Sequence, residues 1–163
     1  MKLEIPQTCR YSLDTNCFVT SWQRTYPPDL FQPVWDYLDR LIHEERVIAS
    51  SLVLLELERK ADEIHEWAKD REDGFVDLIE PLQDHVRGIE RRFPKLLKAH
   101  RNMADPFVIG TAMLTEPRLF VVTEEGRGTG TENRPNIPFV CNALGVECRS
   151  FVDMLRETGF TFR

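Results

Sequence analysis

Acidic side chains that follow short apolar segments are the residues of this sequence best suited to chemistry. Asp14 closes the apolar part of "RYSLDTNCF", where Asp, Thr and Asn in succession are costly to bury without partners. Comparable positions near other apolar segments are held by Glu56, Asp105, Glu124 and Glu125. Carboxylates without Cys or His at metal-ligand spacing are hard oxygen donors, which suit Mg²⁺ or Mn²⁺ and not Zn²⁺. The set therefore predicts a divalent-cation site.

Two of these carboxylates also have explanations that need no cation. Asp14 could form an Asx-turn with Asn16. Asp105 precedes Pro106, which is the pattern of a helix N-cap followed by proline at the first helical position. Capping and cation binding are compatible, because one carboxylate oxygen can accept a backbone N–H while the other meets a metal.

The glutamates are ambiguous when each is taken alone. Glu56 could be an ordinary solvated helix carboxylate, although its apolar neighbours in "LVLLEL" favour a half-buried position. Glu124 and Glu125 could simply form a polar strand end. The prediction of a cation site therefore depends on the set as a whole.

Apolar periodicity predicts the elements that must position these carboxylates. We expect strands over 10–14, 46–51 and 118–125, and helices over 27–45, 52–69, 82–101 (kinked or broken at Pro94), 103–114 and 150–159. The intervening 71–81 should be a connector, 126–136 a loop, and 137–150 a short strand with a turn. Because strands alternate with helices, we expect a mostly parallel sheet covered on both faces. Sites in such sheets form at the carboxyl ends of the strands.

The composition is that of a globular domain. The 163 residues suit one hydrophobic core, and 42% are hydrophobic and 29% charged. No apolar run approaches the roughly 20 residues of a membrane helix, and no signal-peptide core is present, so we expect a cytoplasmic protein without membrane association.

The net charge of −6 excludes nucleic-acid binding by bulk charge alone, but it allows an acidic site beside a basic patch. The four cysteines form no C-x-x-C pair, which predicts reduced, packed thiols.

Four blocks of the sequence, in order, resemble those of the PIN-domain nucleases: "YSLDTNCF", "SSLVLLELE", "ADPFVIGTAM" and "LFVVTEE". Over about residues 10–158 the chain looks similar to the VapC-like toxins of toxin–antitoxin pairs, and within them to a branch labelled only as a domain of unknown function. The resemblance implies one PIN-like domain over 1–163, an α/β fold, and a three-layer α/β/α sandwich with a small, mostly parallel sheet of four or five strands. It also implies a metal-dependent endoribonuclease, an RNA substrate, a small antitoxin partner and a homodimer.

The same resemblance assigns roles to individual residues. By motif, the catalytic and metal-binding residues are Asp14, Glu56, Asp105 and Glu125, with Glu124 as the alternative to Glu125. Thr15, Asn16 and Thr123 would orient these carboxylates or the attacking water. Bound Mg²⁺ or Mn²⁺ would activate a water for attack on an RNA phosphodiester, so no covalent nucleophile is needed.

Two segments depart from the most compact relatives, and substrate choice could lie in either. These are 70–101 and the loop 126–136. Within the loop, "GRGTG" lacks the G-K-[ST] ending and the following helix of a phosphate-binding loop.

Basic residues that could bind RNA phosphates are concentrated in "VRGIERRFPKLLKAHR". They include Arg87, Arg91, Arg92, Lys95 and Lys98, and a solvated helix face explains them equally well. The alternative for the whole chain is a degenerate PIN-like module that binds RNA or a protein without cleavage. A flap-type DNA nuclease is less favoured, because such enzymes carry helical arches for which 163 residues leave little room.

Overall fold

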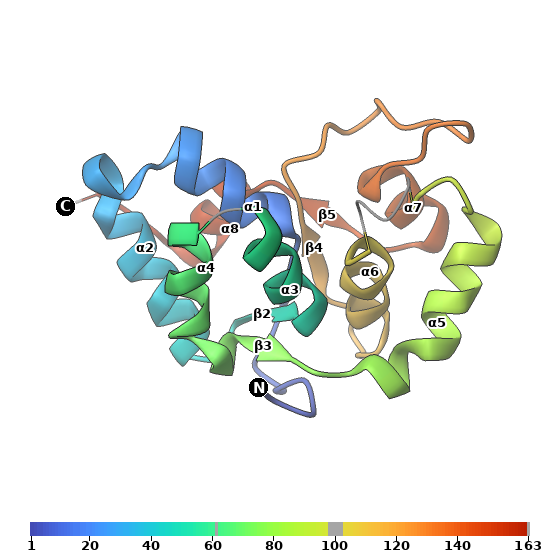
Figure 1. Ribbon diagram of the computed structural model, residues 1–163, viewed down its shortest axis with the longest axis horizontal. Helices are drawn as coiled ribbons and strands as arrows, with labels where there is room; N and C mark the ends of the chain where they lie inside the picture. Colours follow the sequence, from blue (N-terminus) through green and yellow to red (C-terminus); the bar gives the residue numbers. More distant parts are fainter. Residues whose placement is uncertain (61, 98–102, 163) are drawn as a thin grey trace.

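A single parallel sheet forms the centre of the protein. The computed structural model describes residues 1–60, 62–97 and 103–162, and in these residues the sheet has five strands in the order β3-β2-β1-β4-β5 (Figure 1). All four strand pairs are parallel. The strands are β1 (Tyr11–Leu13), β2 (Val47–Ser50), β3 (Phe75–Val76), β4 (Phe120–Val122) and β5 (Cys148–Arg149).

Helices occupy the connections between the strands and both ends of the molecule. Figure 1 shows α2 and α4 at one end of the long axis and α5 at the other. The helices are α1 (Thr15–Thr20), which continues into a π-helical turn (Ser21–Thr25), α2 (Pro28–His43), α3 (Ser51–Lys60), α4 (Asp62–Lys69), α5 (Ile79–Arg92), α6 (Asp105–Met113), α7 (Ile137–Leu144) and α8 (Phe151–Thr158), with a short 3₁₀ turn at Glu72–Gly74.

Side-chain alternation along β1 places different helices on the two faces of the sheet. The Ser12 hydroxyl donates to the carbonyl of Val108 in α6, at 3.0 Å. The Tyr11 hydroxyl donates to Glu157 in α8, at 2.9 Å. Because neighbouring strand residues point to opposite faces, α6 and α8 cover opposite sides. The fold is therefore a three-layer α/β/α sandwich around a parallel sheet, as expected.

The strands are buried because both faces of the sheet are covered. Leu13, Val47 and Val121 are each at most 1% exposed. The core extends beneath α2, where Trp35 is fully buried and its indole N–H donates to the carbonyl of Tyr26. The prediction of free, packed thiols is also confirmed: the four cysteines are free, and all but Cys148 are buried.

Most predicted elements are confirmed, and two predictions are wrong. The connector expected over 71–81 contains the edge strand β3, and the strand expected within 137–150 is preceded by the helix α7. The segment expected as one helix from 52 to 69 is described as α3 and α4, with residue 61 outside the described residues. The helix expected over 82–101 begins earlier, at Ile79, and ends at Arg92, just before Pro94.

Strand order determines where a site can form. The chain proceeds from β1 outward through β2 to β3, then returns to the other side of β1 as β4 and β5. The direction of progression thus reverses between β1 and β4, which is the point where parallel α/β sheets open a crevice at their carboxyl ends. Leu13 pairs with Val122 in register, so Asp14 and Thr123, the next residues of the two strands, are brought together.

Two helical glycines provide a test of the packing between α5 and α6. A methyl group at Gly88 would meet nothing within 4 Å, whereas one at Gly110 would lie 3.3 Å from Leu82 Cδ2. We expect Gly88→Ala to raise the free energy of unfolding by about 0.5–1 kcal/mol, because alanine restricts the unfolded chain and favours helix. Gly110→Ala should gain less, because Leu82 must move. Urea unfolding followed by circular dichroism measures both, and a Gly88→Ala variant no more stable than wild type would contradict this account.

Candidate active site

Asp14 is held at the end of β1 by two hydrogen bonds. It is 2% exposed and stands at the N-cap of α1. Its Oδ1 accepts from the Thr15 N–H at 2.6 Å, and its Oδ2 accepts from the Thr123 hydroxyl at 3.0 Å. Neither donor carries a positive charge, so the carboxylate is oriented without being neutralised. The Asp14 side chain does not accept a hydrogen bond from Asn16, so the Asx-turn that the sequence allowed is not formed.

Asn16 joins the ends of β1 and β4 in another way. Its Oδ1 accepts from the Glu124 backbone N–H at 2.9 Å and lies 3.5 Å from the Thr123 hydroxyl. The three polar residues expected to orient the site thus make different contacts. Thr123 and Thr15 bond directly to carboxylates, while Asn16 positions the backbone of the acidic pair after β4.

Glu56 connects three helices through one carboxylate. It is 7% exposed on α3. Its Oε2 accepts from the Thr15 hydroxyl at 2.6 Å, and its Oε1 accepts from the Ala104 N–H at 3.0 Å, just before α6. The Lys60 ammonium, one helical turn along α3, lies 3.6 Å from Oε2. Glu56 is therefore not the solvated helix carboxylate that its sequence position alone allows.

Asp105 is the carboxylate with an unpartnered oxygen. It is 4% exposed, and its buried Oδ2 has no hydrogen-bond partner. The N-cap interpretation of this residue is wrong, because α6 begins at Asp105 itself, Ala104 occupies the cap position, and no side-chain cap bond forms. A buried carboxylate oxygen without a hydrogen-bond donor destabilises the fold, and buried polar groups in proteins are normally hydrogen-bonded. The requirements of folding therefore do not explain this oxygen.

The two glutamates after β4 point to different helices. Glu124 Oε1 accepts from the Phe151 N–H at 2.7 Å, at the start of α8. Glu125 Oε2 accepts from the Ile137 N–H at 2.7 Å, at the start of α7. Each side chain therefore satisfies a helix N-terminus, where negative charge is favourable. Of these two glutamates, only Glu125 carries a charge that raises the pKa of Asp14 and of Asp105.

Burial and mutual repulsion make both aspartates difficult to ionise in the metal-free protein. Burial, followed by the charges of Glu125 and Glu56, raises the pKa of Asp14 to about 7 despite the opposing hydrogen bonds from Thr123 and Thr15. Burial and then the charge of Asp14 raise the pKa of Asp105 well above its ordinary value, and Lys60 offsets this only in part. Shifts of this kind concentrate at functional sites.

The donor chemistry fits a hard divalent cation, but the side chains are not gathered as ligands. An ion such as Mg²⁺ would neutralise the repulsion between these carboxylates, and it would give the Asp105 oxygen a partner. However, within 1–60, 62–97 and 103–162, no three His, Cys, Asp or Glu side chains are arranged to hold an ion. Binding one would require these side chains to turn toward a common point.

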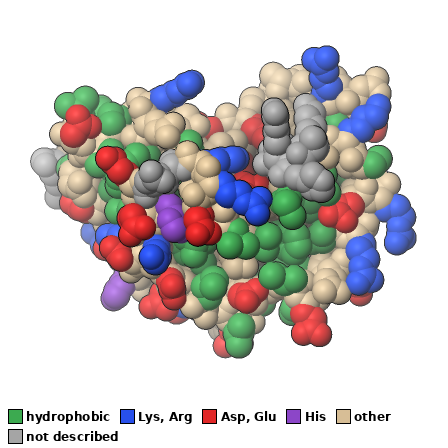
Figure 2. Space-filling view, in the orientation of Figure 1, with side chains coloured by type: hydrophobic (Ala, Val, Ile, Leu, Met, Phe, Trp, Pro, Cys, Tyr) green, Lys and Arg blue, Asp and Glu red, His purple; other side chains and the backbone are tan. Residues whose placement is uncertain are grey.

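The predicted basic residues lie on the outer helix α5 and just beyond it. Figure 2 shows Lys and Arg side chains along the edge of the molecule that α5 forms. Arg87, Arg91, Arg92 and Lys95 are exposed, and α5 packs on α6, the helix that begins with Asp105. Arg87 also lies 3.8 Å from Asp84, and the Lys95 ammonium donates to Asn133 of the loop 126–136 at 3.0 Å. Lys98 lies outside the described residues.

The carboxylates of Asp14, Glu56, Asp105, Glu124 and Glu125 together form what we call the acidic edge of the sheet. Sequence reasoning missed several groups that shape this edge. Lys60 stands four residues after Glu56, a helical spacing that could have indicated the ion pair. The backbone N–H groups of Ala104, Ile137 and Phe151 carry no signal in residue type, because they depend on where helices begin.

Comparison with known proteins identifies a family but no activity. The sequence profile of the family described as "Domain of unknown function (DUF4411)" matches residues 11–162. A search of curated proteins found no significant match. Among the described residues, no helix combines the length and apolar character needed to cross a membrane.

The raised pKa of Asp14 predicts an unusual pH dependence of stability. In EDTA, the folded chain keeps a proton on Asp14 up to about pH 7, whereas the unfolded chain loses it near the ordinary value of 3.8. The free energy of unfolding should therefore fall as pH rises through this window. Asp14→Asn should weaken this fall and be more stable than wild type at pH 8, by about 1–4 kcal/mol at about 1.4 kcal/mol per pKa unit.

Urea unfolding across this pH range measures the effect. Asp84→Asn is the matched control, because the Asp84 side chain is 97% exposed and should change stability little. An Asp14→Asn variant less stable than wild type at pH 8 would mean that Asp14 is not under electrostatic strain.

Proposed function

The chain belongs to the DUF4411 family, whose description names no activity, and we propose that it is a divalent-metal-dependent endoribonuclease of the PIN type. The observation that carries this proposal is the pair of buried aspartates at the switch point of a parallel sheet, one with an unpartnered carboxylate oxygen. Folding alone gives no reason to bury two such groups together. A cation that binds both would relieve the strain.

Each residue of the edge has a proposed role. Asp14 and Asp105 are the primary ligands of Mg²⁺ or Mn²⁺, and Glu125 is the further carboxylate that holds the ion or a water bound to it. When bound, the ion would lower the pKa of a water and stabilise charge on the phosphodiester oxygens. Thr123 and Thr15 fix the orientation of the Asp14 carboxylate before RNA arrives.

Glu56 and Glu124 have positioning roles in this proposal. Both oxygens of Glu56 already accept hydrogen bonds, so it holds the start of α6, and with it Asp105, beside α1. Glu124 is directed to the N-terminus of α8. In this proposal Glu125, and not Glu124, is the acidic ligand that joins Asp14 and Asp105.

The partners follow from the resemblance to VapC-like toxins. We propose a cytoplasmic toxin whose RNA substrate is drawn toward the acidic edge by the exposed Arg side chains of α5 and by Lys95 just beyond it. A small antitoxin protein that covers this edge and a homodimeric assembly belong to the same proposal.

A second function is favoured by one specific observation. In the described residues, no three acidic side chains are gathered at ligand positions. A PIN-like module that binds RNA or a protein without cutting would need no such group of ligands. Cleavage assays and direct cation binding distinguish the two functions.

Cleavage of a mixed RNA pool is the first test. We expect wild type to cut RNA, and not DNA, in Mn²⁺ or Mg²⁺, and to lose this activity in EDTA. Asp14→Asn and Asp105→Asn should each lower the rate by about 100-fold or more, since each removes a charged ligand. Asp84→Asn, on the exposed face of α5, should cut like wild type.

The stability measured for Asp14→Asn separates lost chemistry from lost structure, because that variant should be folded. Wild-type protein that neither cuts RNA nor binds Mn²⁺ by calorimetry would refute the nuclease proposal and leave the binding module.

Mn²⁺ binding distinguishes the two glutamates. We expect Glu125→Gln to weaken Mn²⁺ affinity at least about tenfold, and Glu124→Gln to change it by less than about twofold, since of these two glutamates only Glu125 raises the pKa of the aspartates. Glutamine keeps an oxygen that accepts the helix N–H, so both variants should remain folded. Calorimetry measures the affinities, and a larger loss in Glu124→Gln would reverse the assignment.

A further inference from the structure

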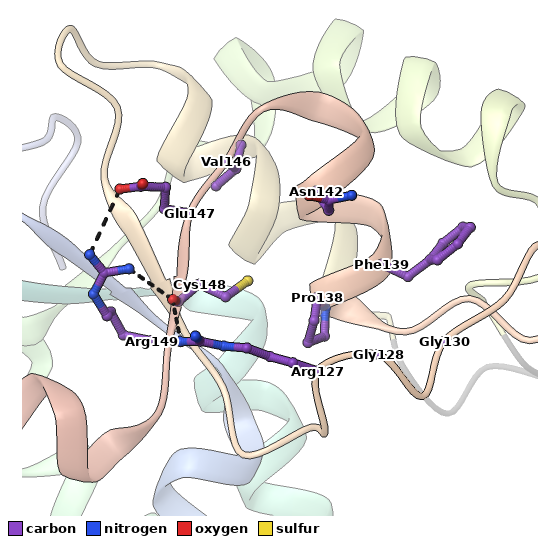
Figure 3. A pocket seen from close by; sticks show the side chains of 10 residues that line it. All are labelled: Arg127, Gly128, Gly130, Pro138, Phe139, Asn142, Val146, Glu147, Cys148 and Arg149. Carbon is purple, nitrogen blue, oxygen red and sulfur yellow. Dashed lines mark hydrogen bonds and ion pairs between the residues drawn. The ribbon is translucent and has the colours of Figure 1, made fainter.

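A cavity of about 410 Å³ lies beside the acidic edge, between the loop 126–136, α7 and β5 (Figure 3). Its volume is within the range of small-molecule sites, roughly 300–1,000 Å³. None of the expected catalytic residues lines it. The proposed nuclease function therefore leaves this cavity unexplained.

The walls of this cavity combine apolar and hydrogen-bonding groups. Figure 3 shows the Cys148 thiol directed into the space between β5 and α7, with Pro138 and Asn142 across from it and Val146 nearby. Asn142 is exposed, so its amide is available at the rim. The Phe139 ring is turned away, and it packs edge-on against Phe93 at 6.2 Å between ring centres. The cavity is thus a slot of mixed character, with apolar groups on part of its wall, the charged side chains of Arg127, Glu147 and Arg149 on the rest, and an exposed amide at Asn142.

Arg127 provides the positive charge of this cavity. Its guanidinium donates to the Cys148 carbonyl at 2.7 Å and lies 3.9 Å from Asp153, yet the side chain remains 61% exposed. Arg149 is less available, because it is bonded to Glu157 at 2.5 Å and lies over the Phe120 ring. Of these two arginines, Arg127 is the one with donors free to meet an anion.

A smaller cavity lies between residues of the slot and residues of the acidic edge. It has a volume of about 180 Å³ and is bordered by Thr123, Glu124 and Glu125. Both cavities are lined by Arg127, Cys148 and Arg149. A chain of nucleotides leaving the carboxylates would therefore pass the Arg127 guanidinium before it reaches the slot.

Two glycines of the loop line the slot. Gly128 has φ of +75°, a conformation that favours glycine. A Cβ at Gly130 would overlap Asn136 and Phe139, so this glycine lets the loop lie directly against α7. The path of the loop beside the slot therefore depends on these two glycines.

We propose that this slot binds one unstacked nucleotide of the RNA, next to the phosphodiester that is cut. The base lies against Pro138 and Val146, the Asn142 amide contacts its hydrogen-bonding edge, and Arg127 binds the phosphate that links it to the acidic edge. Single-stranded RNA is read in this way, with splayed bases held in pockets and bonded at their edges. The inference rests on the proposed function, and it assigns to the slot the selection of the flanking base.

Equilibrium binding of short, fluorescein-labelled single-stranded RNA, measured in EDTA by fluorescence anisotropy, tests the slot without cleavage. Arg127→Ala should weaken binding about tenfold and reduce the salt slope by about 0.7, the value for one phosphate contact on a single strand. Arg134→Ala, at an exposed position of the same loop outside the cavity, is the matched control and should change affinity by less than about twofold.

A second pair of variants blocks the slot sterically. Asn142→Trp places a large ring at the opening and should weaken binding about tenfold, whereas Ala143→Trp, at the next exposed position of α7 and outside the cavity, should leave affinity within about twofold. Asn142→Ala should alter the ratio of affinities among oligo(A), oligo(C) and oligo(U). A role in packing alone would not change that ratio.

The outcomes separate this inference from the proposed function. Wild type that cuts RNA, with Arg127→Ala and Asn142→Trp binding as their controls do, would overturn the slot and leave the nuclease. RNA binding that is lost in these variants of a protein that never cuts would support the slot and refute the nuclease. Wild type that neither binds nor cuts RNA would refute both.

Discussion

Repulsion between buried carboxylates is the constraint on which the rest of this structure depends. The strand order brings the ends of β1 and β4 together, so Asp14 lies within electrostatic range of Glu125 and Asp105 in a region largely closed to water. Burial weakens the screening that would otherwise make such proximity tolerable. The surrounding donors, which include two threonine hydroxyls, backbone N–H groups and the Lys60 ammonium, offset part of this cost and leave one Asp105 oxygen unsatisfied.

The same carboxylates also hold the architecture together. Glu56 joins α3 to α1 and to the start of α6, while Glu124 and Glu125 satisfy the first N–H groups of α8 and α7. A helix N-terminus attracts negative charge, so each acidic residue brings a helix toward the edge of the sheet. An inactive variant at Glu56 would therefore not by itself establish a chemical role, because the position of Asp105 depends on that residue.

Sequence pattern predicted the long, periodic elements and the placement of Asp14, Glu124 and Glu125 directly after strands, but not the short elements or the directions of side chains. The stripe along α2 and the Ser150 and Gly159 caps of α8 have local signals, and both helices are where they were expected. β3 has only two residues, too few for an alternation to be recognised. α7 is short and begins with the apolar run Ile137–Cys141, which resembles a buried strand. Which of Glu124 and Glu125 faces the aspartates depends on where α7 and α8 begin, and no local pattern encodes that.

The position of β1 at the centre of the sheet has a consequence for synthesis of the chain. Of the five strands of this sheet, β1 is synthesised first, yet its neighbour β4 begins only at Phe120, so the central pair joins segments more than a hundred residues apart. Contacts of such high sequence separation form late, and domains complete their folding only when the last partner strand is available. A nascent chain therefore carries Asp14 without Thr123 and Glu125 until most of the protein has been made, and the acidic edge remains incomplete during translation.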